Sequence, residues 1–78
     1  MYRKIVTSVD TQGRSSTEDR GTIPDADRDA DMAYELRRIG NIARSPQGVR
    51  IQTVEDTLNT LVVIYVHGQV KVYHWVEE

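Results

Sequence analysis

Six consecutive apolar residues, Leu61 to Val66, constrain the fold of this chain more than any other feature. The run has the length and the β-branched composition of a buried strand, and it is far too short to cross a bilayer. Neighbouring residues of a strand point to opposite faces of a sheet, so both faces of this strand are apolar. A half-exposed antiparallel strand alternates apolar with polar residues instead. We therefore expect a sheet with two apolar faces in a chain of only 78 residues.

Three further segments have β-branched residues and the alternating polarity of strands. They are residues 2–9, 49–55 and 69–76. Residues 10–22 contain two glycines and many polar side chains without periodicity, so they are predicted to form a flexible loop. Together with a central strand at 60–66, this gives four strands.

A helix is predicted between the first strand and the other three. Thr22 is its candidate N-cap, and Pro24 lies in the first turn, where its missing N–H is tolerated. Ser45-Pro46 is expected to end it. Its apolar stripe recurs at helical spacing, at Met32, Leu36, Ile39 and Ala43. The sequence thus predicts a single α+β domain over residues 1–78, with one helix packed on a four-stranded, mostly antiparallel sheet in the order β-α-β-β-β.

The turn between the last two strands decides which side chains share a face. A tight two-residue turn at His67-Gly68 pairs Val62 with Tyr73. In that register Tyr73 and Trp75 lie on the face of Val62 and Ile64. One helix covers one face of such a sheet, so the other face is predicted to be an interaction surface. The alternative is that residues 10–22 fold back over it, although that segment is polar.

Seven residues are candidates for contact with a protein partner. Acidic side chains recur on the helix opposite its apolar stripe, which favours either a solvated face or a docking surface for a basic partner. Aromatic residues are enriched at interface hot spots, and they are equally common in small cores. The candidates are Asp27, Asp31, Tyr34, Glu35, Tyr65, Tyr73 and Trp75.

The sequence predicts no catalytic residue, no metal site and no cofactor. Residues 25–31, with aspartate at every second position, are similar to the start of an EF-hand calcium loop. Ala30 stands where that loop requires glycine, and Leu36 where it requires glutamate, so an acidic helix start is the preferred interpretation. The chain has two histidines and no cysteine, and it lacks a glycine-rich phosphate loop or a nucleophile motif. We therefore expect it not to be an enzyme.

Charge and hydropathy limit the classes of partner and the cellular compartment that are expected. The net charge is −2, and no contiguous basic region of the size that nucleic-acid binding requires is present, so a nucleic-acid partner is not indicated. The first residues lack the apolar run of a signal peptide, and no apolar segment is long enough to span a membrane. The lack of cysteine fits a reducing compartment. A cytoplasmic protein without membrane contact is expected.

The three-strand segment after the helix carries one resemblance to a known family. The hairpin -Val-Val-Ile-Tyr-Val-His-Gly-Gln-Val-Lys-Val- and its neighbours, Val49 to Trp75, resemble the RelE–ParE type of toxin fold. The resemblance implies an RNA-cleaving role, with His74, Tyr73 and arginines as the residues involved. That family usually has two helices and a basic surface, whereas one helix and a last strand that is not basic are predicted here.

The preferred interpretation is a small non-enzymatic regulator or inhibitor that binds a protein partner, of the kind that phages and mobile elements encode. The first alternative is a structural component of a homo-oligomer, and the second is the toxin-type nuclease. A homodimer is expected, because the uncovered apolar face requires an occupant.

Overall fold

The computed structural model describes residues 1–44, 50–57 and 59–78. In these ranges the chain forms five strands, a short 3-10 helix (η1) and one α-helix. Their bounds are β1 Tyr2–Val9, β2 Ser15–Ile23, η1 Asp25–Asp27, α1 Arg28–Arg44, β3 Ile51–Thr57, β4 Thr60–Tyr65 and β5 Val70–Glu77. The predicted α+β class, with one helix on an antiparallel sheet, is confirmed.

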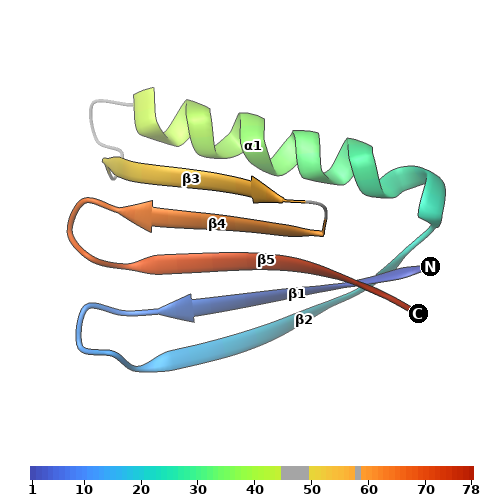
Figure 1. The fold of residues 1–78 in the computed structure, drawn as a ribbon, viewed down its shortest axis with the longest axis horizontal. Coiled ribbons are helices and arrows are strands. Elements are labelled where there is room, and N and C mark those ends of the chain that lie inside the picture. Colours follow the sequence, from blue (N-terminus) through green and yellow to red (C-terminus); the bar gives the residue numbers. More distant parts are fainter. Residues whose placement is uncertain (45–49, 58) are drawn as a thin grey trace.

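All strands belong to one sheet, in which the spatial order is β2-β1-β5-β4-β3 and every pair is antiparallel. The central strand is therefore β5, and not the strand at 60–66 as expected. The first and last strands of the chain are neighbours, which brings the two termini together (Figure 1). The backbone N–H of Glu78 donates a hydrogen bond of 2.8 Å to the carbonyl of Met1.

The prediction of a flexible loop over residues 10–22 is wrong, because most of this segment forms β2. The turn before β2 is short: the Asp10 carboxylate accepts hydrogen bonds of 2.9 Å from the backbone N–H groups of Gln12 and Arg14. Gly13 has a φ of 83°, a conformation that suits glycine. The edge of β1 then supplies hydrogen-bond partners to a strand whose polar side chains remain in water. This adds a fifth strand and changes the order to β-β-α-β-β-β.

The helix α1 begins at Arg28, later than the predicted start after Thr22. Pro24 caps η1, which leads into α1, while Thr22 belongs to β2 and is not an N-cap. The last helical residue is Arg44, and the predicted stop at Ser45-Pro46 lies outside the described residues, as does Val49. Figure 1 shows α1 along the β3 side of the sheet, with β1 and β2 toward the other side.

The hairpin between β4 and β5 has a three-residue loop, one residue longer than predicted. The Tyr65 N–H donates to the Gln69 carbonyl, and the Gly68 N–H donates to the Tyr65 carbonyl, both at 2.9 Å. Gly68 has a φ of 105°, in the left-handed region. The extra residue pairs Leu61 with Tyr73 instead of Val62 with Tyr73. A shift of one residue moves every side chain of a strand to the other face, so the predicted sharing of faces is reversed.

The core lies between α1 and the face of the sheet that carries Leu61. Met32 and Ile39 of the predicted helix stripe are buried there, and Leu36 packs against them partly buried. Trp75, Leu61 and Val63 are fully inaccessible. The other buried apolar residues of this face are Val6, Tyr65 and Tyr73.

Substitutions at two glycines test the backbone conformation of the hairpin turn and of the helix. Replacing Gly68 by alanine should lower the free energy of unfolding by about 1–2 kcal/mol, because an L-residue with a side chain is strained at positive φ. Replacing Gly40 by alanine should raise it by up to about 1 kcal/mol, because alanine favours the helix and its Cβ meets no atom within 4 Å. Urea unfolding curves measure both. Equal effects of the two substitutions would contradict the turn geometry.

Candidate interaction surface

The face of the sheet that points away from α1 is apolar across three strands. Alternate residues of the three inner strands point into the core: Leu61 and Val63 of β4, Tyr73 and Trp75 of β5, and Val6 of β1. The residues next to them in sequence therefore point to the other side of the sheet. No element of the described ranges packs on that side. We call this surface the open face, and on β1, β5 and β4 it consists of Arg3, Ile5, Thr7, Val9, Thr60, Val62, Ile64, Val70, Val72, His74 and Val76.

The open face has an apolar centre with one histidine. His74 lies on the central strand, opposite Ile5 of β1 and Thr60 of β4, and its side chain is exposed. Val72, the next residue of β5 on this face, is partly exposed and lies opposite Val62 and Thr7. Partly exposed β-branched side chains in adjacent rows form a contiguous apolar patch, which on a small protein typically marks an interaction site.

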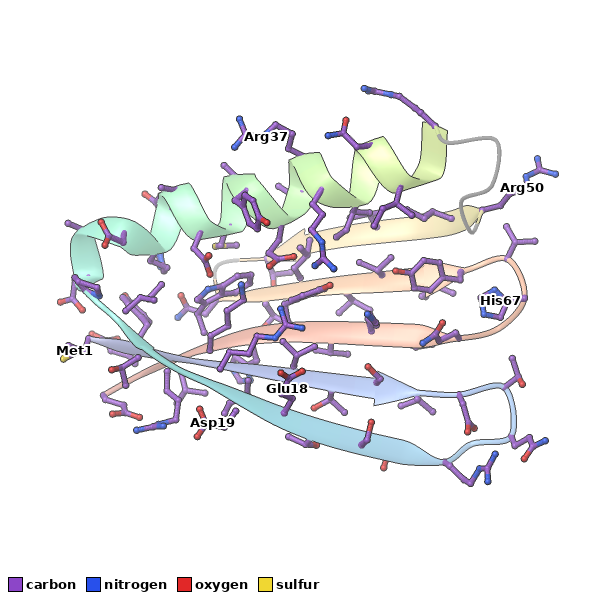
Figure 2. The ribbon with its side chains drawn as sticks, turned by 180° about the vertical axis from the view of Figure 1, so that it is seen from behind. Met1, Glu18, Asp19, Arg37, Arg50 and His67 are labelled. Carbon is purple, nitrogen blue, oxygen red and sulfur yellow. The ribbon has the colours of Figure 1, made fainter. Side chains whose placement is uncertain are left out.

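Charged residues meet the open face at one corner, where they are paired within the chain. The Arg3 guanidinium contacts the Asp19 carboxylate of β2 at 2.8 Å and also the Glu78 carboxylate. The Gly21 backbone N–H donates to Asp19 at 2.8 Å, and this hydrogen bond together with Arg3 lowers the pKa of the Asp19 carboxyl. Figure 2 shows Asp19 toward the end of the sheet where Met1 lies. The corner therefore offers no unpaired charge to a partner.

A buried cluster of charged residues lies under the flank of α1. The Lys4 ammonium of β1 contacts the Glu35 carboxylate at 2.7 Å and the Asp31 carboxylate at 3.0 Å. The Trp75 indole N–H donates to Asp31 at 2.8 Å, and its ring centroid lies 5.7 Å from the ammonium nitrogen. The cluster joins α1 to β1 and β5, which are the first and last strands of the chain.

Glu35 is surrounded by cations and is only 1% exposed. Besides Lys4, Arg38 contacts its carboxylate at 3.3 Å, and Arg20 of β2 approaches it to 4.0 Å. The prediction that Asp31 and Glu35 lie on the solvent side of the helix is therefore wrong. The flank that carries them is turned toward β1 and β2, where burial is tolerated because each carboxylate has cationic or hydrogen-bonding partners.

The three aromatic candidates lie in the core, away from the open face. Trp75 is fully buried, Tyr73 is 2% exposed and Tyr65 is 8% exposed. Burial raises the pKa of the Tyr73 and Tyr65 hydroxyls. Tyr73 and His74 follow each other along β5 and point to opposite faces, so they do not form one site as the toxin resemblance implied.

Two of the seven candidates, Asp27 and Tyr34, are exposed. Asp27 lies exposed in η1, and Tyr34 is 52% exposed on the outer side of α1. The side chain of Asp31 is a quarter exposed but paired with Lys4. A hollow of about 320 Å³ beside Tyr34 is lined by residues of α1 alone, namely Tyr34, Arg37, Arg38, Asn41 and Ile42. A single helix provides no second wall, so this hollow does not enclose a ligand.

Sequence reasoning missed the residues that form the open face. The signal was present at Gly68: a glycine after two other turn residues is typical of a three-residue hairpin loop with its last residue left-handed. That loop fixes the register and places Val70 and Val72 with Ile64 and Val62. The buried role of Lys4 had no local signal, because its partners Asp31 and Glu35 lie far from it in the sequence.

The comparisons with known proteins add no identification. Family models, curated proteins and solved structures were searched, and none matches this chain. Among the residues that the structure describes, no group of three or more His, Asp or Glu side chains is arranged to hold a metal ion. In the same ranges, no helix has the length and apolar character needed to cross a membrane. A function can therefore be inferred only from the surface of the molecule.

The buried cluster predicts an asymmetry between two acidic residues of the helical segment. Replacing Glu35 by alanine should lower the free energy of unfolding by about 3 kcal/mol or more, because it removes one carboxylate from three cations and opens a cavity. Replacing the exposed Asp27 by alanine should cost no more than about 1 kcal/mol, the size of a helix-dipole effect. Thermal and urea unfolding measure both, and similar losses would disprove the burial of Glu35.

Proposed function

We propose that this chain is a small protein-binding module without a reaction of its own, and that it docks a protein partner on the open face. The single observation behind this proposal is the contiguous apolar surface on the side of the sheet opposite α1. It fits a regulator or an inhibitor, which acts by occupying a surface of another protein. The proposal places this action in the cytoplasm, which the lack of cysteine fits.

The composition of the open face supports docking rather than simple exposure. Seven of its eleven residues are valine or isoleucine, and Val76 is 38% exposed. Interface centres are depleted of charge, and the paired corner of Arg3 leaves the middle of this surface uncharged. By contrast, the exposed residues of β2 and of α1 are mostly polar or charged. A protein partner with a flat apolar surface therefore matches the open face best.

Two kinds of protein fit this description. One is a foreign protein that the module regulates, and the other is a second copy of the chain, as in a homodimer or a structural homo-oligomer. The matching surface is the same in both cases, so a single experiment on the open face tests docking before the partner is known.

Position-specific photo-crosslinking tests the proposal. A photo-reactive phenylalanine analogue at position 72 lies in the middle of the open face, and the same analogue at Ala30 lies exposed on α1. Irradiation of the source cells should give discrete crosslinked species from position 72 and none from position 30. Mass spectrometry of the crosslinked peptides identifies the partner as foreign or as the same chain.

The control at position 30 separates docking from random collision. Absence of discrete crosslinks from position 72, or equal crosslinking from both positions, would overturn the proposed function. Circular dichroism and urea unfolding of the two labelled proteins confirm that each is folded before the comparison is made.

A further inference from the structure

We infer that the outer surface of α1 is a second docking site, which binds an acidic segment of a protein through arginines and two exposed apolar side chains. We call this site the basic surface of α1. It consists of Tyr34, Arg37, Arg38, Asn41, Ile42 and Arg44. It shares no residue with the open face, so the inference does not depend on the docking proposed there.

The position of the basic surface follows from the helical periodicity of α1. Met32 and Ile39 are buried and mark the side of the helix that packs on the sheet. Tyr34, Arg37 and Asn41 are spaced by three and four residues, lie on the opposite side and are exposed. Figure 2 shows the Arg37 side chain directed away from the sheet. These side chains are therefore available to a partner.

The charge of this surface exceeds what the helix needs for its own stability. Residues 37–50 contain four arginines and no acidic residue. The helix dipole favours Arg44, which lies in the last turn, but Arg37 lies about two turns earlier, beyond that effect. Among the side chains that the structure describes, Arg38 pairs with Glu35, whereas Arg37 contacts no carboxylate. In the described ranges, no contact of the fold requires a cation at position 37.

Two apolar side chains border the same surface. Tyr34 is 52% exposed and Ile42 is 37% exposed, and they lie one turn before and one turn after Arg38. The hollow of about 320 Å³ lies among these side chains. It is open because one helix lines it, and a protein segment that lies along α1 would supply the missing wall. One large apolar side chain of that segment then packs between Tyr34 and Ile42, away from water.

The charge of the basic surface identifies the class of its partner. An arginine guanidinium forms paired hydrogen bonds with a carboxylate, and arginine and tyrosine are enriched at interface hot spots. Acidic residues on both sides of one large apolar residue therefore match Arg37, Arg44 and the hollow. The exposed Asp29 at the start of α1 repels such a segment, which confines it to residues 34–44 and leaves the crosslinking control at Ala30 outside.

A nucleic acid matches the basic surface less well than an acidic protein segment does. Binding by phosphate neutralisation uses a continuous series of cations, and the net charge of this chain is −2. Arg38 already contacts the Glu35 carboxylate at 3.3 Å. The aliphatic side chain of Ile42 offers neither a phosphate contact nor an aromatic ring on which a base could stack. Few cations beside exposed apolar side chains favour a protein.

NMR titration of the isotope-labelled chain with synthetic peptides tests the inference. A helix rises 1.5 Å per residue, so a peptide of about ten residues spans the distance from Tyr34 to Arg44. The probe has one central leucine among glutamates, and in the control peptide lysine replaces every glutamate. At low ionic strength the acidic peptide should shift the amide signals of Tyr34, Arg37 and Asn41, with a dissociation constant of about 1 mM or lower. The lysine peptide should shift none of them.

Three variants locate the binding. Arg37→Ala should raise the dissociation constant at least about fivefold, because a charge-assisted hydrogen bond to the peptide is lost. Tyr34→Ala should raise it to a similar extent, although it removes no charge. Arg14→Ala removes the same charge as Arg37→Ala, from the exposed turn before β2, and should leave the dissociation constant unchanged. Circular dichroism confirms the fold of each variant.

The opposite results would contradict the inference. It is overturned if the acidic peptide fails to bind at about 1 mM, if the lysine peptide binds equally well, or if Arg14→Ala weakens binding as much as Arg37→Ala. A single-stranded RNA that shifts the same signals and binds more tightly than the acidic peptide would assign the surface to nucleic acid, and would overturn the inference as well.

Discussion

The register between β4 and β5 is the constraint on which the rest of the structure depends. The pairing of Leu61 with Tyr73 places Tyr65, Tyr73 and Trp75 on one side of the sheet, beneath α1. Only one helix is available among the described residues, and it covers the side that holds the aromatic rings. The other side carries mainly valine and isoleucine, which suit a flat contact with another sheet. The three-residue turn that ends in Gly68 maintains this division.

The buried charges fix how α1 sits on the sheet. Lys4 on the first strand holds Glu35 and Asp31 on the helix, and Trp75 on the last strand donates to the same Asp31. A buried ion pair adds little net stability compared with apolar packing, but it penalises arrangements that leave one charge unpaired. The acidic side of the helix therefore serves the fold, and the proposed interaction surface is the open face on the other side of the sheet. This division explains why the open face has few charges of its own.

Much of the fold could be predicted from the sequence, because it depends on local patterns. The helix stripe of Met32, Leu36 and Ile39 and the strand-like segments have the periodicities that secondary structure requires. The second apolar face followed from Leu61–Val66 alone. By contrast, β2 has a polar sequence and forms a strand because the edge of β1 pairs with it, which no local pattern encodes. Which residues form the open face depended on whether the hairpin loop has two or three residues. The burial of Glu35 depended on Lys4, which is distant in the sequence.

The central claim is that the chain covers one side of its sheet and leaves the other to a partner. Solvent paramagnetic relaxation of methyl groups in a dilute sample, where the chain is monomeric, measures this directly. The account predicts fast relaxation for the methyl groups of Val62, Ile64 and Val72 and slow relaxation for those of Leu61 and Val63. Slow relaxation of both sets would mean that the chain itself screens both sides of the sheet, and the claim would be contradicted.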